Sequence, residues 1–245
     1  MGLSFLVCGG TVITSWQATA LPPFVWQPET GGPLRWRTEA PVLTVGVDRE
    51  DVERRLVAGE LACPACGGPL ARWGRARERL VRGREGVSRL VPRRGRCRHC
   101  SRTHVLLPVT FLARRADEVG VIGQALEAKA AGAGHRVIAE VLGRPASTVR
   151  GWLRALAERA EQVRSVFTAL AVWLVTDPPW PAAAGSPVGD AVAAIAAAAV
   201  AAAAFLVVGE VARWQLAAAV TGGMLLAPSW AAGMINTNWP WAAGW

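Results

Sequence analysis

Acidic residues are scarce near the C-terminal end of the chain, where residues 166–245 hold only Asp177, Asp190 and Glu210. Two-metal phosphoryl chemistry needs several carboxylates that converge on ions about 4 Å apart, and Asp177 and Asp190 lie around a proline-rich stretch. Glycine-rich phosphate-binding motifs are also missing. The three histidines lie in a cysteine turn, in the region of short strands and at the start of a helix, and they form no Ser–His–Asp pattern. These absences predict a protein that is not an enzyme and has no small-molecule substrate.

The first residues of the chain lack the basic segment and the small-residue cleavage site of a secretory signal. The chain has five cysteines, and Cys8 has no evident partner. An odd count combined with paired Cys-x-x-Cys spacing suits a reducing compartment better than a set of disulfides. We therefore expect a cytoplasmic, nucleoid-associated protein.

Lysine is almost absent, because Lys129 is the only one, so the net charge of +9 comes from arginine. The charge is uneven. Residues 61–115 hold 14 arginines against Glu78 and Glu85, a net charge of +12, whereas residues 116–165 have a net charge of +1. A dense arginine cluster favours a polyanionic partner, with DNA or RNA ahead of anionic lipid.

Two Cys-x-x-Cys pairs lie in this basic region, separated by thirty residues. Each pair forms a tight turn that directs two thiolates to one side of a tetrahedron, and the doubled spacing is typical of a structural zinc site. Gly67 and Gly68 follow the first pair and accept the positive φ that such turns need. Isolated reduced thiols or a redox pair are the alternatives. His99 and His104 are alternative ligands, although His104 fits better as a surface or strand residue. The expected cofactor is structural zinc, bound by Cys63, Cys66, Cys97 and Cys100.

The residues between and around the cysteine pairs predict short strands. Residues 43–47 have strand character, and Asp48 then suits the N-cap of a helix that runs through Val57. From Leu70 onward, aromatic and basic residues recur two apart, on one face of a strand. Further strands are expected over 88–96 and 103–107. An exposed row of arginines can be a solvated edge that prevents aggregation, but the size of the cluster favours nucleic-acid contact. The expected contacts are Arg75, Arg77, Arg79, Arg93 and Arg94.

Residues 117–165 change to a helical period. A first helix is expected to end at Gly132 and Gly134, and a second runs from Arg136 to Leu142. A third begins near Ala146 and continues at least to Arg164. Its apolar seam has i, i+3, i+4 spacing, and we expect Trp152 in the core. Two helices joined by Gly143-Arg-Pro-Ala follow the helix-turn-helix plan, although the periodicity equally fits any three-helix bundle. The seam consists of Val149, Trp152, Leu153 and Leu156.

The phrase Ile138-Ala-x-x-Leu-Gly, followed by Ser147-Thr-Val-Arg-x-Trp-Leu, resembles the trihelical DNA-binding domain shared by transposases and resolvases. The resemblance implies that the third helix reads DNA with the face away from its seam. Arginine pairs bidentately with guanine, and hydroxyls near a helix start suit a phosphate. The usual capping serine of that family is Pro145 here, so its cap is not matched. The implied DNA contacts are Ser147, Thr148, Arg150 and Arg154, with Ala146 and Gly151 on the same face.

The order of a zinc ribbon and then a helix-turn-helix resembles the N-terminal DNA-binding half of insertion-sequence transposases. It is more similar to an uncharacterised bacterial family, through the phrases at Cys63–Leu70, Arg96–Pro108 and Thr148–Arg154. The resemblance covers about half of the chain, residues 43–165, and implies DNA binding with no known reaction.

Residues 191–208 carry no charge and consist of eleven alanines and seven larger apolar residues. Alanine contributes little to membrane insertion, so spanning is marginal. We expect instead a buried Ala-rich helix that packs on a second helix, Trp214 to Leu226. The tail around Trp239 and Trp241 is aromatic and is expected to dock on its own domain.

Together these features predict a mainly α protein with a small β zinc ribbon, a trihelical helix-turn-helix domain and an Ala-rich helical C-terminal region. The expected function is DNA binding, in transcription regulation or as a transposon-related factor. Alternatives are an accessory or relic of an insertion-sequence transposase, and a membrane-anchored regulator. DNA is the expected partner, with a homodimer or a separate catalytic or regulatory protein as protein partners, and no membrane. The predicted segments are an irregular leader (1–42), the zinc ribbon with a short helix (43–115), the helix-turn-helix domain (116–170), a linker (171–190) and the Ala-rich region (191–245).

Overall fold

The computed structural model describes residues 42–228 and Trp230, and within them seven helices and six strands. Of these residues, 45% are helical and 18% are extended. The protein is therefore mixed α/β, and the expectation of a mainly α chain is corrected. The predicted leader, Cys8 and the tail around Trp239 lie outside the described residues.

Four strands form one sheet in the order β1-β6-β5-β2. Strand β1 pairs with β6 in parallel, and the other two pairings are antiparallel. Two further strands, β3 and β4, form a separate antiparallel hairpin. The strands are β1 (Val42–Val45), β2 (Leu70–Arg75), β3 (Arg79–Arg82), β4 (Val87–Leu90), β5 (Arg93–Cys97) and β6 (Thr103–Pro108).

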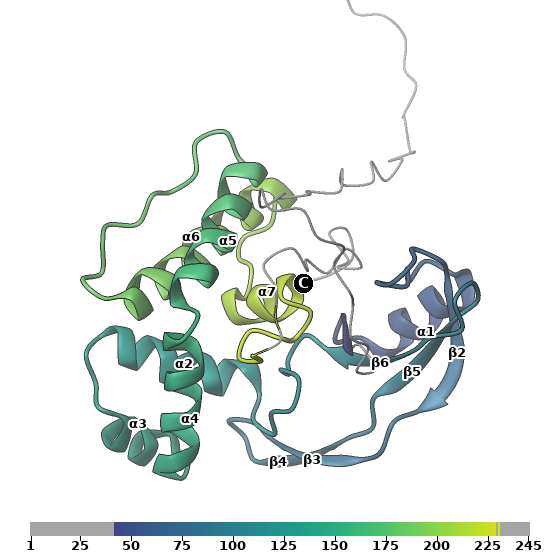
Figure 1. Cartoon of the computed structure of the whole chain (residues 1–245), viewed down its shortest axis with the longest axis horizontal. Helices are drawn as coiled ribbons and strands as arrows, with labels where there is room; N and C mark the ends of the chain where they lie inside the picture. Colours follow the sequence, from purple (N-terminus) through teal and green to yellow (C-terminus); the bar gives the residue numbers. More distant parts are fainter. Residues whose placement is uncertain (1–41, 229, 231–245) are drawn as a thin grey trace, which may run out of the picture. The chain divides into compact units, whose positions relative to one another are not determined.

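The hairpin β3–β4 continues the β2–β5 pair past a bend, which Figure 1 shows as a curved ribbon. Gly74 has a φ of 114° at an irregularity in the β2–β5 register, and the Ala76 N–H donates to the carbonyl of Pro92 at the bend. Proline has no N–H to donate to a ladder. The single strand expected over 88–96 is therefore two strands, and the two-residue alternation from Trp73 to Arg79 does not stay on one face.

Helix α1 (Arg49–Ala58) packs on one face of the sheet. The predicted N-cap is confirmed, because Asp48 Oδ1 accepts a hydrogen bond of 2.8 Å from the Glu50 N–H. Gly59 ends the helix in the left-handed conformation. The buried residues of this first core are Leu43, Val45, Val52, Leu56, Leu61, Cys63, Leu70, Cys97 and Leu106.

Six helices follow the sheet and build a second core. Helix α2 (Val119–Ala130) packs on α3 (His135–Leu142), α4 (Ala146–Ala157), α6 (Pro187–Leu206) and α7 (Arg213–Val220). Gly123 of α2 contacts the Trp214 indole so closely that a Cβ there would overlap the ring. The Trp214 Nε1–H donates to Glu127 Oε1 at 2.8 Å, which holds α7 against α2.

The third helix of the prediction is two helices, because α4 ends at Ala157 and α5 (Ala160–Leu174) begins after Arg159. Arg159 leaves the helical conformation, with a φ of −135°. Its Nε donates to the Ala155 carbonyl at 2.9 Å, and its Nη1 donates to the Ala227 carbonyl. A tertiary contact 68 residues away thus accompanies the break.

The Ala-rich helix α6 packs chiefly along α5 rather than on α7. Ser186 caps it, accepting from the Gly189 N–H at 3.1 Å, and Ile195, Ala198 and Ala202 are fully buried. Helix α6 is the one helix of the described residues whose length and hydropathy would let it cross a membrane. However, 56% of its apolar window is buried inside the protein. The second helix expected over Trp214 to Leu226 ends at Val220.

Candidate metal centre and nucleic-acid interface

The first Cys-x-x-Cys pair forms a tight turn between α1 and β2. The N–H groups of Cys66 and Gly67 donate to the Cys63 carbonyl at 3.3 and 2.8 Å. Gly67 has a φ of 71°, which confirms the expected need for glycine there. Gly68 is required for another reason, because a Cβ would overlap the His99 ring.

The second pair repeats this turn at the end of β5. The Ser101 N–H donates to the Cys97 carbonyl at 3.1 Å, and Ser101 takes the left-handed conformation that Gly67 takes in the first turn. The two turns are joined, since the Arg98 N–H donates to the Pro69 carbonyl at 3.0 Å. Strand pairing between Leu70 and Cys97 completes the connection.

The four sulfur atoms lie within 4.8 Å of one another. Two sulfur pairs are closer, Cys66 to Cys97 at 3.4 Å and Cys63 to Cys100 at 3.7 Å. A tetrahedral ion with metal–sulfur bonds of about 2.3 Å would place its sulfurs about 3.8 Å apart. The cysteines that the sequence predicted therefore form a cluster of the size that holds one metal ion.

Burial and backbone hydrogen bonds shift the pKa values of Cys63 and Cys97 in opposite directions. Desolvation raises the pKa of Cys63 to about 12. Desolvation also opposes ionisation of Cys97, but the N–H groups of Cys100 and His99 point at its sulfur and lower its pKa to about 6. Hydrogen bonds from backbone amides favour the thiolate form that binds metal.

The two histidines near the cluster have different surroundings. His104 is fully buried in β6, with Nε2 3.3 Å from the Cys63 sulfur. Of the two expected placements for His104, surface or strand, the structure confirms the strand. Its ring contacts the sulfur of Cys63, a candidate metal ligand, which suits a residue that orients that thiolate from outside the ligand set. His99 is exposed, and its ring packs over Gly68.

Carboxylates already engage several of the arginines in the basic region. Glu53 of α1 pairs with Arg72 at 2.9 Å and with Arg93, and the hydrogen bond from Arg93 lowers the pKa of Glu53. Arg79 is half-buried, and desolvation lowers the pKa of its guanidinium. Arg94 is half-buried. Five of the expected DNA contacts lie in residues 61–115. Among these five, Arg79, Arg93 and Arg94 are thus the least exposed to solvent.

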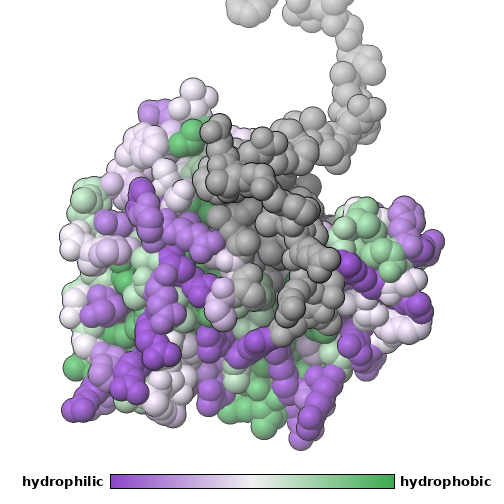
Figure 2. Space-filling view, viewed as in Figure 1, coloured by the Kyte–Doolittle hydropathy of each residue, from purple (hydrophilic) through white to green (hydrophobic). Residues whose placement is uncertain are grey.

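A smaller set of arginines faces solvent. Within residues 61–115, these arginines are exposed and have no ion pair: Arg75, Arg77, Arg84, Arg98 and Arg102. The Arg96 guanidinium stacks over the half-exposed Trp73 ring, 4.4 Å from its centroid. Basic charge therefore remains at the surface along the ribbon, and Figure 2 shows hydrophilic residues over much of this face.

Helices α3 and α4 place the predicted reading residues on the surface. Gly143 ends α3 with a φ of 60°, and α4 begins three residues later. Trp152, Val149 and Leu156 are buried, as expected for the seam. On the opposite face Ser147, Arg150 and Arg154 are exposed, whereas Thr148 is half-buried. Arg154 lies 3.4 Å from Glu158 in an exposed pair.

A buried carboxylate joins the hairpin β3–β4 to the turn between α3 and α4. Asp117 is 2% exposed and accepts two hydrogen bonds from Arg82 of β3, at 3.1 and 2.7 Å. It also accepts from Arg144 Nε at 2.6 Å, and Arg144 Nη2 donates to the Gly83 carbonyl at 3.1 Å. We call Arg82, Asp117 and Arg144 the junction triad. Sequence analysis missed it, because neither spacing nor periodicity relates three charges that lie so far apart in the chain.

Residues 63–152 match the family model DUF6431, a domain of unknown function. The match begins at the first metal-ligand candidate and ends at Trp152 in the middle of α4, so the DUF6431 region contains both cysteine pairs, the hairpin β3–β4 and the whole junction triad. No curated protein and no solved structure matches the chain.

Proposed function

We propose that the chain is a DNA-binding protein that reads duplex DNA with α4 and uses a zinc-stabilised ribbon to bind the phosphate backbone. The exposed face of α4 carries this proposal. Ser147, Arg150 and Arg154 stand clear of the buried seam, directly after a turn that the junction triad holds in place. In a helix-turn-helix, the N-terminal residues of the second helix contact base edges.

The proposed metal is zinc, held by all four cysteines in a structural role. Four thiolates are a soft ligand set, and closed tetrahedral sulfur sites are typical of structural zinc. Cys63 and Cys97 belong to the buried core between α1 and the sheet. Bound metal would thus contribute folding free energy to a small core, and no ligand position is left for catalysis.

The exposed arginines of the ribbon would supply affinity without sequence preference. Each phosphate that a protein neutralises adds about −0.9 to the slope of log affinity against log salt. Because Arg79, Arg93 and Arg94 are half-buried, Arg75 and Arg77 are the better candidates among the predicted residues. Arg150 and Arg154 would instead discriminate between bases, since a bidentate contact contributes about 1–3 kcal/mol.

A salt titration on a selected site and on random duplex tests this division of roles. Replacing Arg75 and Arg77 with Ala should weaken binding to both DNAs equally and flatten the slope by about 2. Arg150→Ala should reduce the preference for the selected site about tenfold. Arg164→Ala is the matched control, because this arginine of α5 pairs with Glu161 at 2.8 Å. Equal losses on both DNAs for Arg150→Ala would rule out α4 as the reader.

The proposed DNA binding could serve either a transcription regulator or a transposon-related factor. A transcription regulator would act alone, whereas a transposon-related factor would act with a separate catalytic chain, which co-purification at native expression would reveal. A membrane-anchored regulator is a second candidate because of the length and hydropathy of α6. Its extensive packing against α5 favours a core helix. Recovery of the full chain only in a detergent-extracted membrane fraction would favour the anchor.

A further inference from the structure

The loop of the β3–β4 hairpin is anchored beside the turn of the helix-turn-helix. The last pair of the hairpin is Arg82 with Val87, and the Gly83 N–H closes the loop on the Gly86 carbonyl at 2.8 Å. The Gly83 carbonyl accepts from Arg144 in the turn before α4. A Cβ on Gly83 would also overlap the Glu118 carboxylate, so the loop backbone lies directly against the start of α2.

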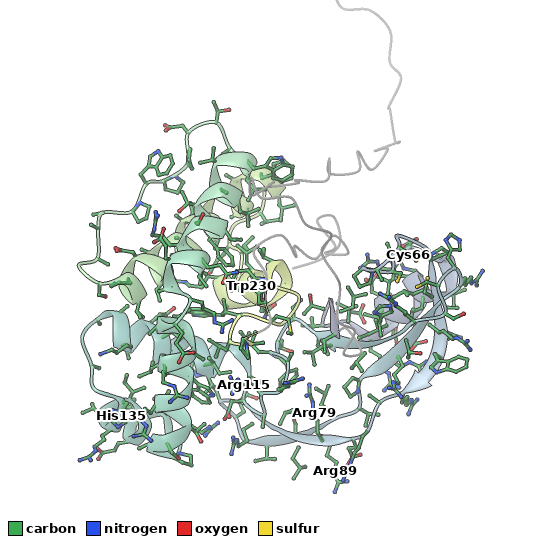
Figure 3. All side chains as sticks on the ribbon, viewed as in Figure 1. Cys66, Arg79, Arg89, Arg115, His135 and Trp230 are labelled. Carbon is green, nitrogen blue, oxygen red and sulfur yellow. The ribbon has the colours of Figure 1, made fainter. Side chains whose placement is uncertain are left out.

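The position of this loop follows from the residues that hold it. Arg144 is two residues before the first residue of α4, and this end of a reading helix lies at the major groove. An element fixed to Arg144 therefore lies at the edge of that groove, where the phosphate backbone separates it from the next minor groove. Figure 1 shows the hairpin as part of a curved ribbon between the β2–β5 pair and the helices, and Figure 3 shows Arg89 on its outer side.

The hairpin presents a single free cation at its tip. Arg84 is exposed and, within residues 42–228, has neither an ion pair nor a hydrogen bond from its side chain. Arg89, further along the same hairpin, is paired with Glu78 at 2.9 Å. Leu80 and Val87 are 60% and 65% exposed on the face that also carries Arg89. Exposed apolar residues on a hairpin that also carries a free arginine suit a groove lined by sugars better than open solvent.

We propose that the hairpin β3–β4 acts as a wing that places Arg84 in the minor groove next to the site read by α4. The inference rests on the proposed DNA binding. A narrow A·T-rich minor groove has an enhanced negative potential that attracts arginine, and the guanine N2 amino group obstructs a G·C groove. The wing thus adds a preference for A·T pairs on one side of the site. Glu85, exposed next to Arg84, opposes the phosphates and keeps this contact weak.

The test uses the full-length, metal-loaded chain and a selected duplex whose flank carries A·T, G·C or inosine·C pairs. Inosine lacks the N2 amino group, so inosine·C presents an A·T-like minor groove with a G·C-like major groove. Wild type should bind A·T and inosine·C flanks equally, and about 5- to 10-fold more tightly than G·C flanks. Arg84→Ala should bind all three flanks equally, at the G·C level, and lose hydroxyl-radical protection of the flank only.

Two matched variants distinguish the proposed minor-groove contact of Arg84 from a general effect of charge on DNA affinity. Arg89→Ala should keep the flank preference, because this arginine is already paired. Glu85→Gln should raise affinity for all flanks by a similar factor. Thermal melting of each variant confirms that the exposed substitutions leave the fold intact. If wild type binds duplex but Arg84→Ala retains the flank preference, the wing is overturned and DNA binding stands. If wild type binds no duplex, both proposals fail.

Discussion

Ser101 holds a backbone conformation that glycine holds in the equivalent position of the first cysteine turn. Its φ is 60°, against 71° for Gly67. The left-handed conformation costs a residue with a Cβ about 1–2 kcal/mol. The second turn therefore carries strain that the first turn avoids, and its N–H bond to the Cys97 carbonyl helps to maintain it.

This asymmetry predicts opposite effects of two substitutions on the metal-loaded protein. Gly67→Ala should lower the free energy of unfolding by about 1 kcal/mol, because a Cβ is added in the left-handed region. Ser101→Gly should raise the free energy of unfolding by about 0.5 kcal/mol, because relief of the left-handed strain outweighs the added conformational entropy of the unfolded chain. Urea unfolding at saturating zinc measures both. A loss of stability in Ser101→Gly would show that the serine side chain contributes more than its strain costs.

At the scale of elements, the junction triad joins the hairpin β3–β4 to the start of α2 and to the turn between α3 and α4. Asp117 lies between β6 and α2 and accepts hydrogen bonds from a strand of the hairpin and from the turn before α4. Arg82 and Arg144 donate directed hydrogen bonds to this carboxylate in addition to balancing its charge. The same arrangement makes Asp117 costly to replace, because two guanidinium groups would then lack their shared carboxylate.

Asp117→Asn should lower the free energy of unfolding by about 3 kcal/mol. It should also speed hydrogen exchange in the hairpin loop, residues 83–86, and in the turn 143–145, while exchange around the cysteine cluster stays the same. Glu158→Gln is the control, since its exposed pair with Arg154 contributes less than about 0.5 kcal/mol. Unchanged exchange in both the loop and the turn would show that the triad does not position the two elements.

At the scale of the whole molecule, the described residues contain two main cores. One lies between α1 and the sheet and includes two metal-ligand candidates, whereas the other is built by α2 to α7 and includes none. Contacts such as the Thr44 hydroxyl donating to the Ala219 carbonyl at 3.4 Å link them. Bound metal should therefore stabilise the core between α1 and the sheet directly. It should stabilise the core of α2 to α7 only through contacts between the two cores.

Removal of the metal tests this separation. A chelator should strongly increase hydrogen exchange in residues 42–108, while the buried parts of α5 and α6 remain protected. Returning zinc should restore protection in the first region. Cys97→Ser should behave like the chelator and should not respond to zinc. Simultaneous loss of protection in both regions would mean that the two cores unfold as one unit.

The sequence determined the local parts of this protein. The doubled Cys-x-x-Cys spacing predicted the cluster, because each ligand pair is set by a turn of four residues. Asp48 and Gly143 marked helix ends through their own backbone and side-chain preferences. The apolar seam of α4 was equally legible, since Val149, Trp152 and Leu156 follow the helical period into the core.

Tertiary structure decided what depends on contacts between distant residues. The expected strand of arginines bends at Gly74 and Pro92, Arg93 turns to Glu53, and Arg79 becomes half-buried, so period-two spacing overestimated the exposed patch. Helix α4 stops near Arg159, whose side chain reaches a carbonyl 68 residues away. The junction triad joins Arg82, Asp117 and Arg144 across three elements. Such contacts depend on how elements pack, and local pattern carries no information about which distant group will complete them.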